Sequence, residues 1–289
     1  PGLDADHLWA ANGSNEIMLH LLQAFGGPGR TALSFAPTYS MYPEYARDTH
    51  TRWVAGRREE DFTLDVDAAI ALIREEQPAV VFLPSPNNPT GTALPISAVE
   101  QILAAARTSG PDGAATVVVV DEAYAEFRRE GTPSALSLLA ANQHLAVTRT
   151  MSKAFGMAGA RLGYLAAAPA LVDMLRIVRL PYHLSAVTQA VALAALAHTD
   201  ELMAQVASLR AERDALVEWL DLHGLDAVPS DANFVLFGKF KDRHAIWQSL
   251  LDAGILIREV GPDGWLRVSI GTPDETAAFK AALVEVLGA

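Results

Sequence analysis

The chain has no cysteine among its 289 residues, and this absence excludes several kinds of chemistry. Without cysteine there is no disulfide, no thiolate nucleophile and no cysteine-ligated zinc, and we expect no metal in the functional site. No apolar run approaches the roughly 20 residues that a helix needs to cross a bilayer. Since proteins of the reducing cytosol seldom carry disulfides, we expect a cytoplasmic protein that does not insert into a membrane.

Basic residues are also few, with 22 Lys and Arg against 34 Asp and Glu and a formal net charge of −12. This charge argues against a nucleic-acid-binding protein, which would carry a basic face, and against binding to an anionic membrane surface. Only four of the basic residues are lysines. A function that needs a lysine side chain therefore has four candidates, which are Lys153, Lys239, Lys241 and Lys280.

The residues that are present describe a globular protein, with 51% hydrophobic and 19% charged residues. A chain of this length buries roughly three quarters of its unfolded surface and needs no crosslink for stability. Up to about Pro181, short apolar runs alternate with segments of helical length, which predicts an α/β fold with a mainly parallel sheet and helices on both faces. The expected strands are 7–11, 31–35, 52–55, 79–83, 116–120, 145–148 and 162–166, and the expected helices are 15–25, 41–48, 65–76 and 97–107, the last capped by Ser97.

The pattern changes after Pro181. A largely helical stretch over 185–223, with a break near 198–200, precedes a smaller α+β arrangement. We therefore predict a large domain over 1–181 and a small C-terminal domain over 182–289. The strands expected in the small domain are 234–237, 255–258 and 266–270, and the helices are 245–253 and 274–287.

Open parallel sheets bind ligands beyond the carboxyl ends of their strands, and four polar clusters follow predicted strands in this sequence. In the first, Gly13 lets a ligand approach the backbone, and Ser14 and Asn15 open a helix whose free N–H groups favour an anion such as phosphate. The same residue types also make an ordinary helix cap. In the second, prolines stiffen the loop 85–91 and aim the amide of Asn88, although Asn, Pro and Gly are common in plain turns as well.

The third and fourth clusters contain an acid and a lysine. Asp121 ends an apolar strand, where a carboxylate persists only if it is paired or has a shifted pKa, and a protonated ring nitrogen is one such partner. Tyr124 reaches the same place, and helix capping is the alternative role for Asp121. Lys153 lies among small residues, with Arg161 eight positions on. A desolvated lysine near another cation has a lowered pKa and forms a Schiff base, whereas the alternative is a lysine on a surface loop.

Together the clusters supply an anion cradle, an amide, a buried carboxylate and a reactive lysine, which are the groups that pyridoxal 5′-phosphate needs. Over essentially its whole length the sequence resembles the fold-type-I aminotransferases of class I and II, which use this cofactor. The segment 150–159 is similar to the class II lysine-attachment signature. Three further motifs follow one another in the same order as in the family. They are the segment 88–91, Asp121 with Tyr124, and Ser152-Lys153 with Arg161. Within the family the chain is most similar to the histidinol-phosphate aminotransferases, in the stretches 12–18, 37–42, 230–234 and 266–272.

The resemblance implies a role for each of these residues. Lys153 attaches the cofactor and moves a proton between substrate and cofactor, while Asp121 pairs with the nitrogen of the cofactor ring. Asn88 and Tyr124 hydrogen-bond the ring oxygen, and Tyr39 stacks on the ring, with core packing as its alternative role. The residues that hold the cofactor phosphate are Ser14, Asn15, Ser152 and Arg161.

Two arginines of the predicted small domain suit an anionic substrate. Arg267 corresponds to the substrate-anion arginine of the family, and Arg258 is an arginine position of the histidinol-phosphate aminotransferases. Two guanidinium groups that face one site match a phosphate or a carboxylate, although surface ion pairing is the alternative for Arg258. The resemblance also implies that Asn233 helps to bind the substrate carboxylate.

The activity that the resemblance implies is a transamination in histidine biosynthesis, carried out by a homodimer. L-Glutamate gives its amino group and leaves as 2-oxoglutarate, and imidazole-acetol phosphate becomes L-histidinol phosphate, a phosphorylated amino alcohol. The alternatives are an aromatic amino acid aminotransferase, a lyase such as a threonine-phosphate decarboxylase, and a ligand-sensing domain that kept the fold. Family members carry a further N-terminal segment, and we expect this segment to be missing because the chain begins at Pro1, in the middle of the family pattern.

Overall fold

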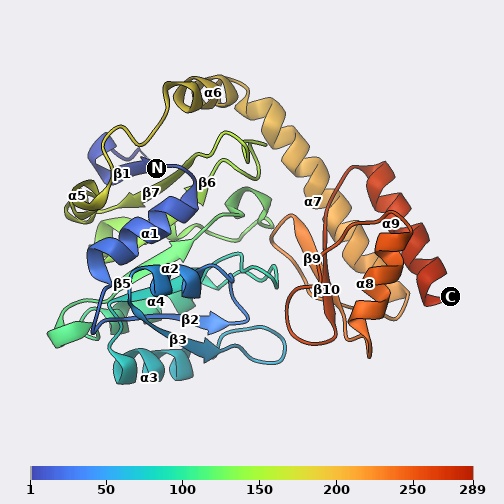
Figure 1. Ribbon diagram of the computed structural model, residues 1–289, viewed down its shortest axis with the longest axis horizontal. Helices are drawn as coiled ribbons and strands as arrows, with labels where there is room; N and C mark the ends of the chain where they lie inside the picture. Colours follow the sequence, from blue (N-terminus) through green and yellow to red (C-terminus); the bar gives the residue numbers. More distant parts are fainter. Residues whose placement is uncertain (1, 289) are drawn as a thin grey trace.

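The computed structural model describes residues 2–288, so Pro1 and Ala289, the outer ends of the two predicted domains, lie outside it. A sheet of seven strands and a sheet of three strands form the two halves of the molecule (Figure 1). The helix α7 (Thr199–Leu222) runs diagonally between them in Figure 1. The active-site candidates of the sequence lie in both halves, so the arrangement of the two sheets determines the site.

Seven strands form the larger sheet. They are β1 (Leu8–Ala11), β2 (Thr31–Ala36), β3 (Arg52–Arg57), β4 (Val80–Pro84), β5 (Val117–Asp121), β6 (Leu145–Thr150) and β7 (Gly163–Ala167). Their order is β1-β7-β6-β5-β4-β2-β3. The pairs from β3 to β6 are parallel, whereas β7 is antiparallel to both β6 and β1. The mainly parallel α/β sheet that the sequence predicts is confirmed.

Helices pack on both faces of this sheet. They are α1 (Ser14–Phe25), α2 (Tyr42–Asp48), α3 (Val66–Glu76), α4 (Ile96–Ala106) and α5 (Pro169–Val178). Because side chains of a strand point alternately to the two faces, Val117 and Val119 of β5 pack in one core with α1, α2 and α5. Val118 and Val120 pack in a second core with α3 and α4. Burial on both faces explains why β5 is apolar throughout and ends in a single polar residue, Asp121.

The smaller sheet is antiparallel, with β9 (Phe234–Gly238) between β8 (Asp226–Ala227) and β10 (Trp265–Ser269). The helices α7, α8 (Arg243–Asp252) and α9 (Pro273–Leu287) share its apolar core. The helical stretch expected over 185–223 is made by α6 (Ala186–Ala197) and α7, with the break at His198. The domain division at 181–182 falls between α5 and α6 and stays a prediction.

Several features of the elements differ from what the sequence pattern predicts. Residues 255–258 do not form a strand, because only Arg258 pairs with β10, in an isolated bridge to Arg267. The helix α4 begins after Pro95 rather than after a Ser97 cap. The pattern does not predict α5, which begins at a proline directly after β7 and so leaves no polar boundary to mark it.

Short 3₁₀ helices complete the described chain, and none of the helices within residues 2–288 has both the length and the apolar character needed to cross a membrane. The 3₁₀ helices are η1 (Ala5–His7), η2 (Pro111–Gly113), η3 (Ala125–Phe127) and η4 (Ala135–Ala141).

Candidate active site

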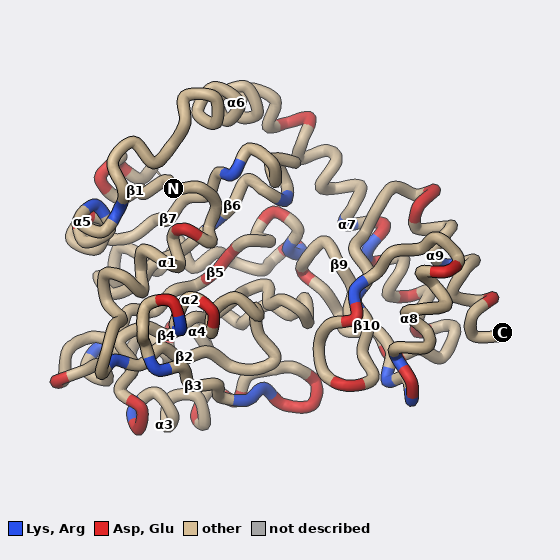
Figure 2. Tube along the Cα trace, in the orientation of Figure 1, with Lys and Arg blue, Asp and Glu red and all other residues tan. Residues whose placement is uncertain are grey.

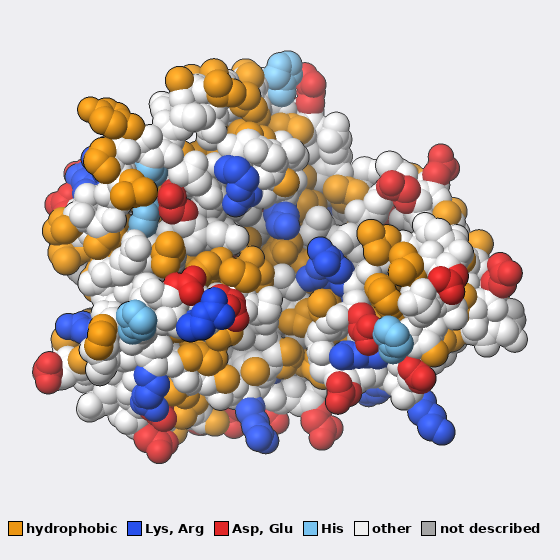
Figure 3. All heavy atoms as spheres, in the orientation of Figure 1, with side chains coloured by type: hydrophobic (Ala, Val, Ile, Leu, Met, Phe, Trp, Pro, Cys, Tyr) orange, Lys and Arg blue, Asp and Glu red, His pale blue; other side chains and the backbone are white. Residues whose placement is uncertain are grey.

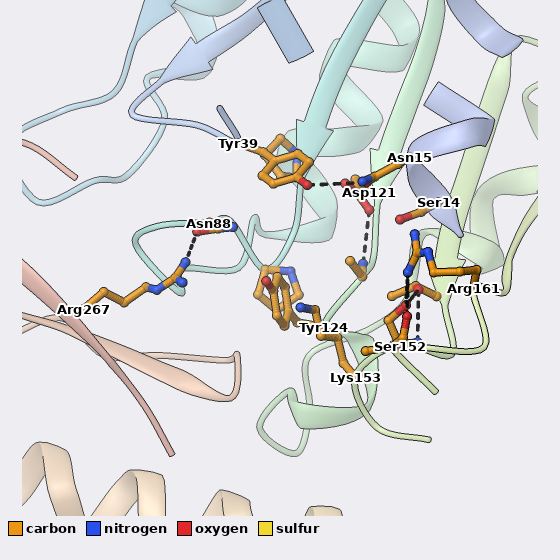
Figure 4. A pocket seen from close by; sticks show the side chains of 15 residues that line it. Ser14, Asn15, Tyr39, Asn88, Asp121, Tyr124, Ser152, Lys153, Arg161 and Arg267 are labelled. Carbon is orange, nitrogen blue, oxygen red and sulfur yellow. Dashed lines mark hydrogen bonds between the residues drawn. The ribbon is translucent and has the colours of Figure 1, made fainter. Parts of the chain in front are cut away.

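A cavity of about 240 Å³ opens at the carboxyl edge of β4 and β5, beside the start of α1 and the loop after β6 (Figure 4). Arg267 of β10 reaches this cavity from the smaller sheet. The structure thus brings together side chains from both halves of the chain, as Figure 4 shows. Ten predicted site residues line the cavity: Ser14, Asn15, Tyr39, Asn88, Asp121, Tyr124, Ser152, Lys153, Arg161 and Arg267.

The cavity is locally basic although the chain carries a net charge of −12. Lys153, Arg161 and Arg267 all line it. Basic positions lie in the middle of the molecule, between the two sheets, in Figure 2, and blue side chains surround a hollow there in Figure 3. A local basic pocket in an acidic protein favours a small anionic ligand over a large anionic surface.

Lys153 lies in the loop between β6 and β7, and its Nζ is 5.6 Å from the centroid of the Tyr124 ring. The side chain stays accessible through the cavity. Partial burial nevertheless lowers the pKa of Lys153, and the positive charges of Arg267 and Arg161 lower it further. Because the neutral amine is the nucleophile, this environment makes Lys153 more reactive near neutral pH than an ordinary lysine.

Asp121 is the last residue of β5, and only 7% of its surface is exposed. Its carboxylate accepts hydrogen bonds from the hydroxyls of Tyr42 (2.8 Å) and Thr148 (3.1 Å) and from the backbone N–H of Ala123 (3.2 Å). Burial raises the pKa of Asp121 more than these hydrogen bonds lower it, and no described cation contributes. A carboxylate has about four acceptor positions, so Asp121 can take one more donor from the cavity.

An anion cradle lies at the start of α1. No described side chain caps this helix at Gly13, so its first N–H groups are available to a ligand beside Ser14 and Asn15. Gly13 (φ +84°) packs so closely on Arg161 that a Cβ there would overlap the guanidinium group. Arg161 Nη1 in turn donates to Ser152 Oγ (3.3 Å). Backbone N–H groups, hydroxyls and a guanidinium at one point suit a phosphate.

These donors fit pyridoxal 5′-phosphate, the cofactor that the resemblance implies. The cradle suits its phosphate, and the amine of Lys153 suits its aldehyde carbon. Its ring nitrogen, when protonated, supplies the donor and the positive charge that buried Asp121 lacks. Burial raises the pKa of Tyr124 to about 12, despite the opposing charge of Arg267, so the Tyr124 hydroxyl remains a hydrogen-bond donor. On the other wall, the Tyr39 hydroxyl donates to Asn15 Oδ1 (3.4 Å).

Arg267 connects the smaller sheet to the cavity. Its Nη1 donates to Asn88 Oδ1, and its guanidinium lies 4.6 Å from the centroid of the Phe234 ring. Its buried Nε has no hydrogen-bond partner among the described residues. Burial lowers the pKa of Arg267, and the charge of Arg258 lowers it further. A bound anion would accept a hydrogen bond from Arg267 Nε and would balance the buried positive charge.

A second cavity, of about 680 Å³, adjoins the first and shares Tyr39, Asn88 and Arg267 with it. Arg258 lines this second cavity and not the first. The backbones of Arg258 and Arg267 exchange two hydrogen bonds of 2.9 Å, which puts both side chains on one side of the bridge. The nearby Glu259 pairs with Arg243 instead of Arg258. The remaining residues that line the second cavity are Ala36, Pro37, Thr38, Ser40, Pro89, Val260, Gly261 and Pro262.

Two predicted site residues lie outside the lining of both cavities. Gly13 lies behind Arg161, and its lack of a side chain lets the guanidinium of Arg161 pack against the backbone. Asn233 lies just before β9, and its carbonyl accepts a hydrogen bond from Ile270 N (2.9 Å). Its proposed role at the substrate carboxylate therefore stays a prediction.

The structure adds residues that the sequence motifs do not single out. Tyr42 and Thr148 hold Asp121, and Thr150 Oγ1 donates to Ser152 Oγ (2.9 Å). Tyr42 lies within the stretch 37–42 that resembles the histidinol-phosphate aminotransferases. Nothing in that stretch indicates that the Tyr42 hydroxyl reaches β5. Thr148 has a possible signal, because it is the first polar residue after the apolar start of β6 and lies beside Asp121 in the parallel register.

Comparisons with known proteins agree with this geometry. The family model for aminotransferase class I and II matches residues 2–283. A histidinol-phosphate aminotransferase of Thermobifida fusca is 64% identical over 287 residues, 99% of this chain and 76% of that protein. Histidinol-phosphate aminotransferase 3 of Burkholderia lata is 59% identical over 285 residues, 99% of this chain and 75% of that protein. The solved histidinol-phosphate aminotransferase of Sinorhizobium meliloti, in complex with pyridoxal 5′-phosphate, has a TM-score of 0.88 at 26% identity, covering 99% of this chain and 78% of that one.

Proposed function

The chain belongs to the class I and II aminotransferase family, and on this premise we propose that it transaminates between L-glutamate and imidazole-acetol phosphate, yielding 2-oxoglutarate and L-histidinol phosphate in histidine biosynthesis. Its cofactor is pyridoxal 5′-phosphate. The observation that carries the proposal is the donor set for this cofactor next to a second cavity with two arginines.

The cofactor, when bound, withdraws electrons from the substrate α-carbon and keeps the amino group between the two half-reactions. Lys153 Nζ would attach the cofactor and would then carry the proton between the substrate α-carbon and the C4′ carbon of the cofactor. The lowered pKa of Lys153 increases the share of neutral amine available for this task. Asp121 holds the proton on the ring nitrogen, and Tyr42 and Thr148 keep the carboxylate in place through their hydrogen bonds.

Arginines bind the anionic groups of the two substrates. Arg267 lies in both cavities and pairs with the substrate carboxylate or phosphate, replacing its contact with the Asn88 amide. Arg258 lies farther along, in the second cavity, and takes the anionic group at the far end of the substrate. The proposal also keeps Asn233 as a contact of the substrate carboxylate.

We include in the proposal that the enzyme is a homodimer of the cytoplasm. Exposed apolar side chains around α6 support the dimer, since Ile177, Leu180, Val187 and Leu193 are 70–74% exposed and Tyr182 is 98% exposed. Figure 3 shows apolar side chains (orange) gathered over α6. Apolar patches of this kind mark interaction sites on proteins.

The test separates the two half-reactions. Purified protein is loaded with pyridoxal 5′-phosphate and treated with L-glutamate, and the change in the cofactor absorbance band is followed. Imidazole-acetol phosphate or phenylpyruvate is then added as amino acceptor. We expect the phosphorylated acceptor to restore the band at far lower concentration, and Lys153→Ala to abolish the band.

Each competing activity has its own outcome in this experiment. A preference for phenylpyruvate would identify an aromatic aminotransferase. Release of carbon dioxide without dependence on glutamate would identify a lyase. A protein that binds the cofactor but reacts with no amino donor would be a ligand-sensing domain, and a protein that neither binds it nor forms the band contradicts the proposal outright.

A further inference from the structure

Arg213, in the middle of α7, is completely buried, with 0% of its surface exposed. It is the largest of the fully buried side chains of the described chain. A charge removed from water is unfavourable unless hydrogen bonds and an opposite charge compensate it. The residue lines neither cavity, so its burial calls for a role other than ligand binding.

The guanidinium of Arg213 bonds to both halves of the molecule. Its Nη1 donates to the carbonyl oxygens of Phe127 (2.6 Å) and Ala232 (3.2 Å). Phe127 ends η3, which follows β5 of the larger sheet, whereas Ala232 lies just before β9 of the smaller sheet. Its Nε and Nη2 donate to the two carboxylate oxygens of Asp214 (3.0 and 3.2 Å). Few groups other than this planar fork can make all four bonds at once.

The two carbonyls that Arg213 holds belong to segments that carry active-site side chains. Tyr124 is three residues before Phe127, and Phe234 is two residues after Ala232. The rings of Tyr124 and Phe234 meet edge to face, with centroids 5.1 Å apart. The guanidinium of Arg267 lies 4.6 Å from the Phe234 ring centroid. A shift of Ala232 against Phe127 would therefore move Arg267 relative to Tyr124 and Lys153.

A second set of contacts joins the same segments. Arg129 donates from its side chain to Asp214 (3.0 Å) and from its backbone N–H to Asp231 (2.7 Å). The backbone N–H of Asp231 donates to the carbonyl of Gly91 (2.7 Å), in the loop that carries Asn88. The contacts of Arg213 and Asp214 are thus the buried centre of a larger polar junction between the sheets.

We propose that Arg213 is a positioning residue that sets the smaller sheet against the larger one and so aims Arg267 at the substrate anion. The inference rests on the proposed function for the choice of substrate, but the distance between the sheets does not depend on it. Arg213 touches neither cofactor nor substrate. Its replacement should therefore weaken substrate binding more than cofactor binding, which a merely stabilising residue would not do.

The experiment compares Arg213→Met, Arg213→Lys and Asp214→Asn with the wild-type protein loaded with cofactor. Arg213→Met keeps the volume of the side chain and removes the donors, whereas lysine keeps the charge and loses the fork. Asp214 is half-exposed, so Asp214→Asn is the variant least apt to disturb folding. Arg210→Met is the matched control, because Arg210 lies on the same helix and its side chain forms no hydrogen bond or ion pair within residues 2–288.

Two readouts are measured for each variant. The first is the L-glutamate concentration that half-saturates the half-reaction, together with its limiting rate and the affinity for cofactor. The second is the distance distribution between spin labels on Glu100→Cys of α4 and Glu285→Cys of α9. Both label positions are exposed, and labelling is clean because the chain has no cysteine of its own.

We expect Arg213→Met to raise the half-saturating glutamate concentration roughly tenfold or more, since small misplacements of binding groups have effects of this size. Its cofactor affinity should stay within about twofold, and its label distances should shift or broaden. Arg213→Lys and Asp214→Asn should show smaller changes of the same kind, and Arg210→Met none.

Wild-type label distances and wild-type glutamate saturation in folded Arg213→Met overturn the proposal, whatever its melting temperature. If Arg213→Met does not fold, the same two readouts in Arg213→Lys and Asp214→Asn decide, and wild-type values in both overturn it. If the wild-type protein fails to react with glutamate, the proposed function fails, and the label distances alone decide the role of Arg213.

Discussion

At the scale of single residues, Asp121 and its neighbour Glu122 are both buried acids with opposite surroundings. Glu122 is 1% exposed and pairs with Arg149 (2.8 Å) and Arg128 (3.3 Å). Asp121 has hydrogen bonds only, and burial raises its pKa. A raised pKa means that the folded apoprotein holds this proton more tightly than the unfolded chain does. Ionisation of Asp121 therefore destabilises the fold as the pH rises through its pKa.

We predict that Asp121→Asn makes the protein without cofactor as stable as the wild type at pH 7, or more stable, while the glutamate half-reaction slows on the order of a hundredfold. The neutral amide removes a buried charge without a cation but loses the partner of the ring nitrogen. Thermal unfolding and stopped-flow absorbance measure the two effects.

Glu122→Gln is the matched control for this prediction. Its loss leaves the partly buried Arg128 without its carboxylate and Arg149 with only the more distant Glu126 (3.7 Å), so stability should fall by about 3 kcal/mol. A strong loss of stability in Asp121→Asn, similar to that of Glu122→Gln, would show that Asp121 is a structural acid.

The reactivity of Lys153 leads to a prediction about pH. Burial, Arg267 and Arg161 lower the pKa of Lys153, in that order of size. Removal of a positive charge raises this pKa, so the amine loses its proton at higher pH. We predict that the pH midpoint for attachment of pyridoxal to the apoprotein moves upward in Arg267→Met and, by less, in Arg161→Met.

Arg258→Met serves as the control for charge in this titration, because Arg258 lines only the second cavity and does not act on the pKa of Lys153. A midpoint that stays fixed in both Arg267→Met and Arg161→Met, or that moves equally in Arg258→Met, would contradict the assignment of these charges.

At the scale of elements, the start of α1 is placed by its contact with β7. Gly163 of β7 pairs with Ala11 of β1, and a Cβ at Gly163 would overlap Ser14 N and the carbonyl carbon of Gly13. We predict that Gly163→Ala displaces the anion cradle, weakens binding of pyridoxal 5′-phosphate at least tenfold and lowers stability by about 1–3 kcal/mol. Equilibrium dialysis and denaturant unfolding measure the two changes.

Gly159→Ala is the control within the same loop region. A Cβ at Gly159 would meet nothing within 4 Å, and its φ is not in the left-handed region. Cofactor affinity in this variant should equal that of the wild type. Equal effects of the two substitutions would mean that the loop as a whole, and not the contact with α1, determines the affinity.

The elements that carry the site are largely predictable from the sequence, because apolar runs and polar strand ends are local signals. The loops around Asn15, Asn88, Asp121 and Lys153 each follow a predicted strand, and parallel strands bring their ends to one edge. The strand expected over 255–258 fails because a strand exists only through its partner, and the partner β10 meets that segment only at Arg258.

At the scale of the whole molecule, the contacts that are least predictable join residues far apart in sequence. The mainly parallel sheet follows from the alternation of strands and helices. The hydrogen bond from Tyr42 to Asp121 and the bonds of Arg213 to Phe127 and Ala232 have no local pattern. Such contacts depend on the packing of distant segments, so a single sequence indicates the residue types at a site more readily than the residues that hold them.

The exposed surface of α6 leads to the last prediction, which concerns assembly. The helix reads Ala-Val-Thr-Gln-Ala-Val-Ala-Leu-Ala-Ala-Leu-Ala, yet only Thr188 and Ala192 of it are buried. A helix that is apolar all round is normally buried, and burial of one Val or Leu side chain contributes about 1.5–3 kcal/mol. In a symmetric dimer each such side chain is buried twice, once in each subunit.

We therefore predict that the double substitution Val187→Glu and Leu193→Glu converts the dimer into a folded monomer, as measured by sedimentation equilibrium. The control is Leu222→Glu at the end of α7, where Leu222 is 84% exposed, and this variant should remain a dimer. A monomeric wild type would contradict the dimer, and a double variant that remains dimeric would place the subunit contact elsewhere.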